Sequence, residues 1–348
     1  MTSFRSGDIA AITAERSGLQ KVDVLFPGES TTQRAYNLSD LTGPVSVGDR
    51  VVCNTTAVEL GLGTGGWHIV HWNQANDELH IPGDGHIMKL RYTSLQRNTG
   101  AAEEHEPGIG VDLQHIPVVA CSLHSQVGVV AAAFAASCSN ARLAYVMTDG
   151  AALPLSLSDL AHDLTSKGLL CGTVTAGHAF GGTHEAVNVQ SALTIARSLL
   201  HADAIVVGMG PGVVGSGTEL GNTALEVTAI LHAVASLNGR AIACLRVGSG
   251  DDRVRHQGLS HHSVTALSHV RPGTSFAVGV PTDDETDLSL LDRLAATVNV
   301  DRVEVPDVEV LLDRFGLDIT TMGRKPAADR AFFAFAAAAG VLAATMLA

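Results

Sequence analysis

Six short apolar runs recur from about residue 116 onward, and they constrain the fold more than any other feature of the chain. They read IPVVAC, LAYVM, LLCGTVT, DAIVVGM, AIACLRV and SFAVGV. Nearly continuous apolar runs of this length are typical of strands buried on both faces of a parallel sheet. The segments between the runs are long enough for crossover helices, so the pattern predicts a three-layer, Rossmann-like α/β fold.

Two of the crossover helices can be identified individually. The segment QVGVVAAAFAASC follows the first apolar run. The segment SLSDLAHDLTSKG begins with Ser and Asp, which are good N-cap residues, and ends at Gly168, a residue suited to a helix C-terminus. We therefore expect strands and helices to alternate throughout this part of the chain.

The chain up to about Tyr92 has a different rhythm, in which short strand-like segments alternate with turn residues. These segments read QKVDVLFPGE, RAYNLSD, VSVGDRVVCN, GWHIVHW and HIMKLRY. Their spacing predicts a small β barrel or sandwich. The polar, acidic stretch 93–112 has no periodicity and is expected to be a linker. The 348 residues are thus predicted to form a β-rich domain (1–92) and an α/β domain (113–348).

The C-terminal segment from Ala331, AFFAFAAAAGVLAATMLA, is close in length to the ~20 apolar residues that span a bilayer. Most of these residues are Ala, which favours a helix but contributes little to membrane insertion. We therefore predict a helix docked on the protein rather than a tail anchor. The same helix can dock on a neighbouring copy instead, which would make the protein a homodimer.

Charge and cysteine content exclude several classes of protein. The formal net charge is -13, so the field of the whole protein opposes binding to nucleic acid or to anionic membrane surfaces. The 5 cysteines are scattered and form no C-x-x-C pair, which argues against a disulfide framework and against a thiolate zinc site. The N-terminal residues lack the apolar core of a signal peptide. A cytoplasmic location is expected.

Polar residues follow the apolar runs at the carboxyl ends of the predicted strands, where open α/β sheets bind their ligands. His124 follows the first run, Asp149 the second and His178 the third. Because these ends share one edge of the sheet, we expect the three side chains to lie near one another. A carboxylate beside an imidazole raises its basicity, so they are candidates for general acid and base catalysis.

A glycine-rich stretch follows the run DAIVVGM. Its candidate ligand-binding residues are Gly208, Gly210, Gly212, Gly215, Gly217 and Thr218. We predict a strand-to-helix turn whose bare backbone N–H groups at the helix start bind an anion. The glycines formally satisfy G-x-G-x-x-G, but the acidic residue of a dinucleotide site is not clearly placed and no P-loop lysine follows. A tight turn with close packing is the structural alternative.

The densest group of titratable residues follows the run AIACLRV. Its candidate catalytic residues are His256, His261 and His262, and its candidate ligand-binding residues are Arg253 and Arg255. The histidine spacing matches no recognised zinc motif, so neither a metal nor any other cofactor can be assigned. In a purely structural alternative, the arginines pair with Asp251 and Asp252 and the histidines cap the next helix.

Several of these runs also carry a resemblance. GDGHIMKLRYTSLQ, VMTDGAALPLSLSDL, TAGHAFGGTHEAVN, GMGPGVVGSGTELG and RHQGLSHHSVTAL occur in this order. They resemble a bacterial family known as domain of unknown function 3866, over nearly the whole chain. The resemblance implies that these loops belong together and that the chain is bacterial, but it implies no activity, substrate or cofactor.

Three functional hypotheses follow from these patterns. The first is an enzyme that binds a small anionic metabolite, phosphate-like or nucleotide-like, at the glycine-rich loop and moves protons with the histidines. The second is a divalent-metal-dependent hydrolase that uses His256, His261 and His262, with His178 or Asp149 as a further ligand. The third is a binding or scaffold protein without catalytic activity.

Overall fold

The computed structural model describes residues 2–63, 65–294 and 297–347, and the chain divides into two compact units, residues 1–100 and 101–348. Short elements occupy the stretch expected to be a linker and its border. They are the paired strands β6 (Met88–Lys89) and β7 (Arg97–Asn98) and the 3-10 turn η1 (Ala102–Glu104).

The N-terminal unit is a closed barrel of five strands in the order β1-β2-β3-β5-β4. The strands are β1 (Phe4–Arg16), β2 (Leu19–Leu25), β3 (Gln33–Asn37), β4 (Arg50–Asn54) and β5 (His68–Asn73). The pairing of β3 with β5 is parallel and the other pairings are antiparallel. Two short helices, α1 (Ser39–Thr42) and α2 (Thr56–Glu59), lie in the connections on either side of β4.

The predicted β-rich N-terminal part is confirmed, but the sequence analysis missed strand β1. Polar and charged residues interrupt β1, and only Ile9 on it joins the buried core of the barrel, with Val22, Val24 and Val51 among its neighbours. The alternation that identifies a half-buried strand is therefore weak in β1. The segment HIMKLRY, in contrast, forms only the two residues of β6.

The C-terminal unit is built on an eight-stranded parallel sheet in the order β11-β10-β9-β12-β8-β13-β16-β17. Its strands are β8 (Pro117–Cys121), β9 (Leu143–Thr148), β10 (Gly172–Thr175), β11 (His184–Glu185), β12 (Ala204–Met209), β13 (Arg240–Cys244), β16 (Phe276–Pro281) and β17 (Val298–Val303). All six predicted strands are present. The edge strands β11 and β17 were not predicted, because both are polar and partly exposed.

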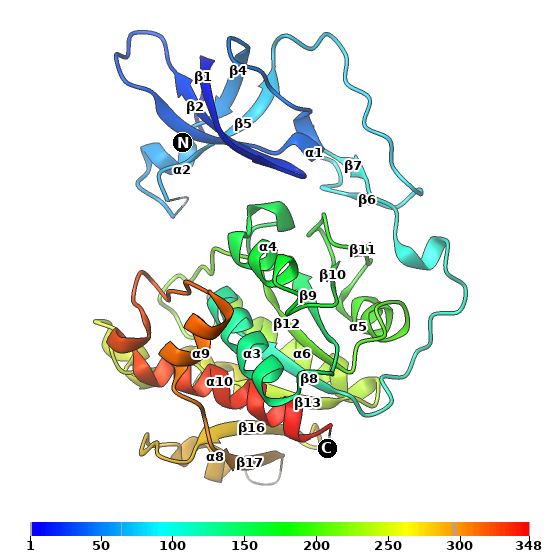
Figure 1. Cartoon of the computed structure of the whole chain (residues 1–348), viewed down its shortest axis with the longest axis vertical. Coiled ribbons are helices and arrows are strands. Elements are labelled where there is room, and N and C mark those ends of the chain that lie inside the picture. The colour runs from blue at the N-terminus through cyan, green and yellow to red at the C-terminus, as the bar shows by residue number, and fades with distance from the viewer. Residues whose placement is uncertain (1, 64, 295–296, 348) are drawn as a thin grey trace. The chain divides into compact units, whose positions relative to one another are not determined.

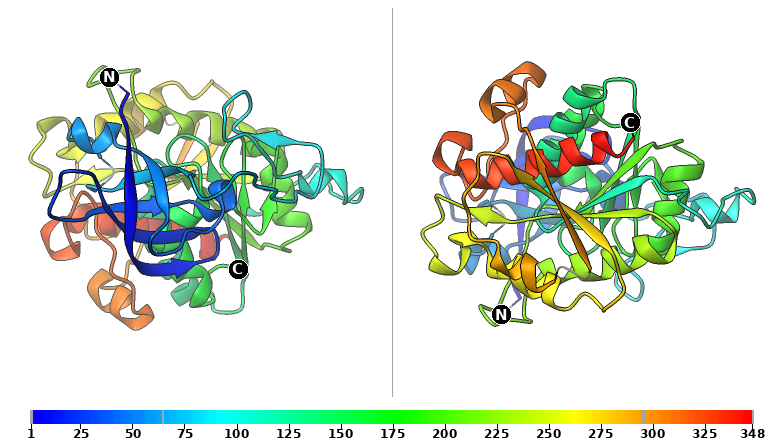
Figure 2. Two further views of the ribbon diagram at one scale, coloured as in Figure 1. Left: turned by 90° about the horizontal axis from the view of Figure 1, so that it is seen from above. Right: turned by 90° about the horizontal axis from the view of Figure 1, so that it is seen from below.

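Helices cover both faces of this sheet, as Figures 1 and 2 show, which confirms the predicted three-layer α/β fold. On one face lie α3 (His124–Ser137), α4 (Asp159–Ser166), α9 (Val308–Phe315) and α10 (Arg330–Thr345). On the other lie α5 (Val189–Ser198), α6 (Glu226–Ser236), α7 (His261–Ser268) and α8 (Ser289–Arg293). The 3-10 turns are η2 (Leu155–Leu157), η3 (Thr223–Leu225), η4 (Val254–His256) and η5 (Pro326–Ala328).

The two helices identified from sequence are present, but strands and helices do not alternate strictly as expected. Ser158 caps α4 by accepting a hydrogen bond from the backbone N–H of Ala161, and Gly168 follows its end with a φ of 69°. Gly168 thus adopts the left-handed conformation that glycine tolerates best. Between β10 and β11, however, the chain has a loop and no helix.

The alanine-rich C-terminal segment forms α10, which packs on its own chain as predicted. Phe332 and Phe333 are buried with most of the alanines between α3 and the sheet, and Phe335 is buried among residues that form the core of the other face. Gly340 lies under the backbone of α3, where a Cβ atom would come close to the carbonyl oxygen of Val130. Among the described residues, no helix has both the length and the apolar character to cross a membrane.

The connections between strands diverge at the centre of the sheet. The chain leaves β8 through α3 on one face, whereas it leaves β12 and β13 through α6 and α7 on the opposite face. Because β12, β8 and β13 are adjacent, their outgoing loops separate and leave a crevice at the carboxyl ends of the strands. This is the location at which open α/β sheets bind ligands.

Candidate functional site

A cavity of about 100 Å³ lies at the carboxyl ends of β12, β8 and β13. From the glycine-rich loop after β12 it is lined by Gly215, Gly217 and Thr218. From the loops after β13 it is lined by three arginines and three histidines, namely Arg246, Arg253, Arg255, His256, His261 and His262. The fold thus brings most of the predicted residues from these two distant segments to one cavity. We call it the histidine cavity.

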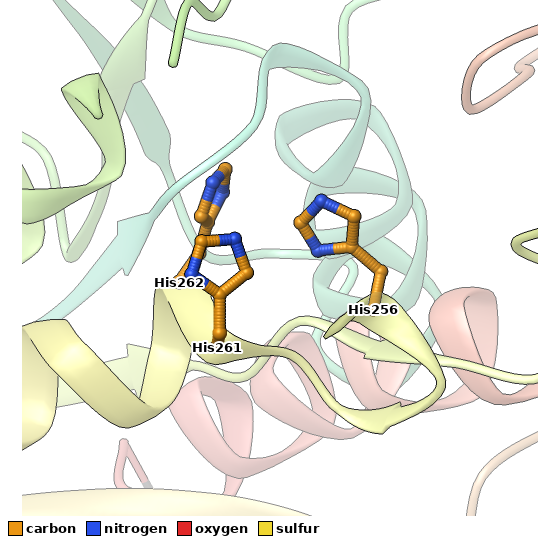
Figure 3. A group of neighbouring side chains, drawn as sticks. All are labelled: His256, His261 and His262. Carbon is orange, nitrogen blue, oxygen red and sulfur yellow. The ribbon is translucent and has the colours of Figure 1, made fainter. Parts of the chain in front are cut away.

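The three histidine rings are in mutual contact inside this cavity. Their centroids are separated by 4.4 to 5.0 Å, and one ring nitrogen from each lies within 4.8 Å of the others. Figure 3 shows His256 approaching from one loop and His261 and His262 from the start of α7. His256 and His262 are buried, and His261 is partly exposed.

Arg246 determines the protonation of His262. Its Nη1 atom lies 3.1 Å from Nδ1 of His262, and a guanidinium group can only donate hydrogen bonds. The Nδ1 atom must therefore accept, so the neutral ring carries its proton on Nε2. A Cβ atom placed on Gly215 would lie 3.9 Å from this Nε2, which indicates that the nitrogen faces the glycine-rich loop. His262 thus presents an N–H donor to the cavity.

The other two histidines are held less completely. His256 Nδ1 lies 2.7 Å from the hydroxyl of Ser260, which also caps α7 by accepting from the backbone N–H of His262. His261 Nε2 is a buried atom with no hydrogen-bond partner among the described residues, and so is Oδ1 of Asn222, which lines the same cavity. Buried polar atoms normally have partners, so such atoms call for a ligand, an ion or water.

A network of arginines and carboxylates supports the cavity from behind. Arg253 binds Asp251 through two hydrogen bonds of 2.9 and 2.8 Å, and Arg324 and Arg246 approach the same carboxylate at 3.1 and 3.5 Å. The bond to Arg253 holds the pKa of Asp251 well below its usual range. Asp329, just before α10, accepts from the backbone of Ser249 and binds Arg324. The network therefore ties the loop after β13 to the C-terminal helix.

The cavity has an excess of positive charge. Asp251 is shared by three arginines, and Arg255 lines the cavity without an ion pair in the part of the chain that the structure describes. Burial, together with the nearby Arg246, lowers the pKa values of His256 and His262 to about 3. Burial also lowers the pKa of His261. The histidines are therefore neutral near pH 7 and act as hydrogen-bonding groups, while the arginines carry the charge.

The predicted helix start at the glycine-rich loop is wrong. Gly208 lies inside β12, and α6 begins only at Glu226, after the turn η3. A Cβ atom on Gly210 would lie 2.5 Å from the carbonyl oxygen of Ala152, so Gly210 permits close packing. Gly212 and Gly217 have positive φ values and shape the loop. Gly208, Gly210 and Gly212 do not line the histidine cavity, whereas Gly215, Gly217 and Thr218 do.

His124 lies outside the histidine cavity and uses both of its ring nitrogens. Nε2 lies 2.7 Å from the hydroxyl of Ser158, and Nδ1 lies 3.2 Å from the carbonyl oxygen of Met209. Burial lowers its pKa to about 4. These contacts join α3, α4 and the end of β12, and they leave neither nitrogen free.

Asp149 and His178 meet each other but not the three histidines. A carboxylate oxygen of Asp149 accepts a hydrogen bond of 2.9 Å from the backbone N–H of His178, and the loop after β10 passes so close that a Cβ atom on Gly177 would overlap that carboxylate. Neither residue lines the histidine cavity. Nearby, burial raises the pKa of Glu226 to about 7, and the charge of Asp149 adds to this effect.

Sequence reasoning missed several residues of the site. Arg246 lies near the end of the apolar run AIACLRV. An arginine in a buried run normally has a charged partner, so this position was a signal that the sequence analysis did not use. Arg324 and Asp329 had no local signal, because they lie far along the chain from the loop that they hold. A larger cavity of about 460 Å³ lies at the ends of β16 and β17, but none of the predicted site residues lines it.

The profile of the family described as "Protein of unknown function (DUF3866)" matches residues 34–340. No curated protein matches the chain.

Proposed function

The chain belongs to the DUF3866 family, and from that premise we propose that its α/β unit binds a small oxyanion, a phosphate or carboxylate group of a metabolite, in the histidine cavity. The family description states no activity. The proposal therefore depends on the chemistry of the cavity.

The observation that carries the proposal is the contact between Arg246 and His262. A guanidinium group that donates to Nδ1 leaves an N–H group at Nε2, and this group faces the cavity. Arg255 supplies a second donor and a full positive charge at the same cavity. Among the described residues that line the cavity there is no carboxylate to compete, and donors with positive charge are the features that an oxyanion needs.

The size of the cavity agrees with a group rather than a whole metabolite. Pockets that enclose complete drug-sized ligands measure ~300–1,000 Å³. The histidine cavity, at about 100 Å³, is large enough for one phosphate or carboxylate group. The remainder of the ligand would lie outside it.

The same histidines suit proton transfer. A neutral imidazole beside a bound oxyanion can accept a proton from the ligand and return it. His261 is the best placed for this role, because its Nε2 atom has no protein partner in the described structure and its ring is partly exposed. An enzyme that acts next to the bound anion is therefore our favoured form of the proposal.

A divalent metal is the second candidate, favoured by the three ring nitrogens within 4.8 Å of one another. The Nδ1 atom of His256 has a hydroxyl partner, which is compatible with a ligating Nε2. His262 does not fit as well, because ligating histidines normally donate their second N–H group to a carboxylate or carbonyl, and here a guanidinium occupies that nitrogen. Elemental analysis of the purified protein tests this candidate, and less than about 0.1 metal per chain would exclude it.

Thermal unfolding with inorganic phosphate and with acetate tests the oxyanion proposal. We expect one of the two anions to raise the melting temperature of the native chain, with saturation in the millimolar range, and chloride at equal ionic strength to have no such effect. Arg255→Ala should remove the shift. Arg271→Ala, which removes an exposed arginine outside the cavity, should retain it. A shift of equal size in both variants would overturn the proposal.

A further inference from the structure

A second cavity of about 360 Å³ adjoins the histidine cavity. Leu123, Val213 and Met322 line both cavities and form the boundary between them. Leu160 of α4 and Ile319 add further apolar side chains to its lining, together with the hydroxyl side chains of Ser125, Thr320 and Thr321. We call it the apolar cavity.

The apolar cavity differs from the histidine cavity in charge. Among the described residues, no arginine or lysine lines it. Asp318 also lines it, but this carboxylate is 78% exposed and pairs with Lys325 at 3.2 Å, so it faces water. His124 also lines the cavity, with both ring nitrogens bonded to protein groups. The apolar cavity therefore suits an uncharged part of a ligand.

We propose that one ligand occupies both cavities, an organic anion whose phosphate or carboxylate group enters the histidine cavity and whose largely apolar body fills the apolar cavity. This inference rests on the oxyanion site proposed above. The volume of the apolar cavity lies within the range of pockets that hold small organic molecules. The histidine cavity alone is too small for such a body.

The boundary between the cavities contains one exposed and adaptable side chain. Met322 is 64% exposed, and methionine is the most adaptable of the apolar side chains. Val213 is partly exposed and belongs to the glycine-rich loop. Rotation of Met322 would open this boundary while Leu123 and Val213 stay packed against the core.

Isothermal titration with matched probes tests the inference. Inorganic phosphate and acetate represent the anion alone, and 1-naphthyl phosphate and 1-naphthoate carry the same groups on an apolar body. We expect the naphthyl form of the preferred anion to bind at least about tenfold more tightly than the simple anion, because its body leaves water for the apolar cavity.

Thr320→Trp is the decisive variant, because Thr320 is exposed, lines the apolar cavity and does not line the histidine cavity. The tryptophan should lower the affinity for the naphthyl probe about tenfold and leave that for the simple anion unchanged. The matched control is Thr345→Trp. This exposed threonine lies near the end of α10. There Arg240, at the start of β13, donates a hydrogen bond to the carbonyl oxygen of Met346, so Thr345 lies at the amino ends of the strands, away from both cavities.

The outcomes separate the two proposals. Equal affinities for simple and naphthyl anions, with binding lost in Arg255→Ala, would overturn the two-cavity ligand and leave the oxyanion site intact. Failure of all four probes to bind would overturn both. In a third outcome, the naphthyl probe binds more tightly than the simple anion and keeps the same affinity in Thr320→Trp and in Thr345→Trp. That outcome would place the apolar body outside the apolar cavity and overturn the inference.

Discussion

The guanidinium of Arg246 lies between the carboxylate of Asp251, at 3.5 Å, and Nδ1 of His262, at 3.1 Å. Arg253 and Arg324 bind the same carboxylate, so two further arginines fix Asp251, which in turn positions Arg246. The guanidinium group has no lone pair that could accept a hydrogen bond, so Arg246 must donate and Nδ1 of His262 must accept. The tautomer of His262, and with it the donor character of the cavity, follows from this chain of contacts.

Replacement of Arg246 by methionine tests this dependence. Asp251 keeps two partners in Arg246→Met, so we expect a loss of about 2 kcal/mol in the free energy of unfolding, the order of a buried hydrogen bond to a charged group. Binding of the preferred oxyanion should weaken at least about tenfold. Urea denaturation and titration calorimetry measure the two effects. Unchanged anion affinity in a folded variant would contradict the role given to Arg246.

Replacement of Glu226 by glutamine should stabilise the protein above neutral pH. Burial raises the pKa of Glu226 from 4.5 to about 7, so the folded state binds its proton more tightly than the unfolded state. Stability from this group is present below pH 4.5 and is lost as the pH rises towards 7. At pH 8, Glu226→Gln should raise the free energy of unfolding by up to about 3 kcal/mol. The exposed control Glu106→Gln should have no such effect, and a destabilised Glu226→Gln at pH 8 would show that the charged carboxylate is needed.

His124 should stabilise the protein at neutral pH and lose this contribution as the pH falls, whereas the contribution of Glu226 is lost as the pH rises. Burial lowers its pKa from 6.5 to about 4, so the unfolded state takes up a proton first as the pH falls. Its contribution is complete above pH 6.5 and is lost between about pH 6.5 and pH 4. From pH 7 to pH 4.5 the free energy of unfolding falls in both chains. The fall should be about 2 to 3 kcal/mol smaller in His124→Gln than in the native chain. Parallel urea denaturation curves at the two pH values measure this difference, and equal losses would show that His124 does not titrate on unfolding.

Two alanine substitutions in the glycine-rich loop should have different effects. A Cβ atom in Gly210→Ala would lie 2.5 Å from a backbone carbonyl oxygen, so we expect a loss of at least about 2 kcal/mol in stability. In Gly215→Ala the new atom would lie 3.4 Å from Asn222 and 3.9 Å from His262, which are ordinary contacts. Gly215→Ala should fold with nearly native stability and bind the oxyanion more weakly. Native anion affinity in Gly215→Ala would place the anion away from this loop.

The strands and helices could be predicted where the pattern of apolar residues was continuous. The six runs from IPVVAC to SFAVGV became the buried strands of the sheet, and the tail from Ala331 became α10, because burial on both faces requires uninterrupted apolar residues. Strands β1, β11 and β17 were missed, because their exposed faces carry polar residues and their pattern is weak.

Proximity within the candidate site could be predicted only in part. The rule that ligands bind at the carboxyl edge of the sheet pointed to the loops after β12 and β13, and both line the histidine cavity. The same rule did not separate His124, Asp149 and His178 from the other histidines. The order β10-β9-β12-β8-β13 places Asp149 and His178 farther along this edge. His124 follows the central strand β8, but it starts α3 and contacts Ser158 at the start of α4, on the face opposite to α6 and α7.

The sequence by itself determined the class of fold, since hydrophobic periodicity is a local property that burial imposes on each segment in turn. The tertiary structure alone decided which polar groups meet and what each one donates or accepts. Arg324 and Asp329 lie far along the chain from Arg246 and from the loop after β13, and their contacts with that loop depend on the order of the strands and on how α10 docks. The proton on His262 depends in turn on those contacts, and a hydrogen-bond direction is a property of two groups in space.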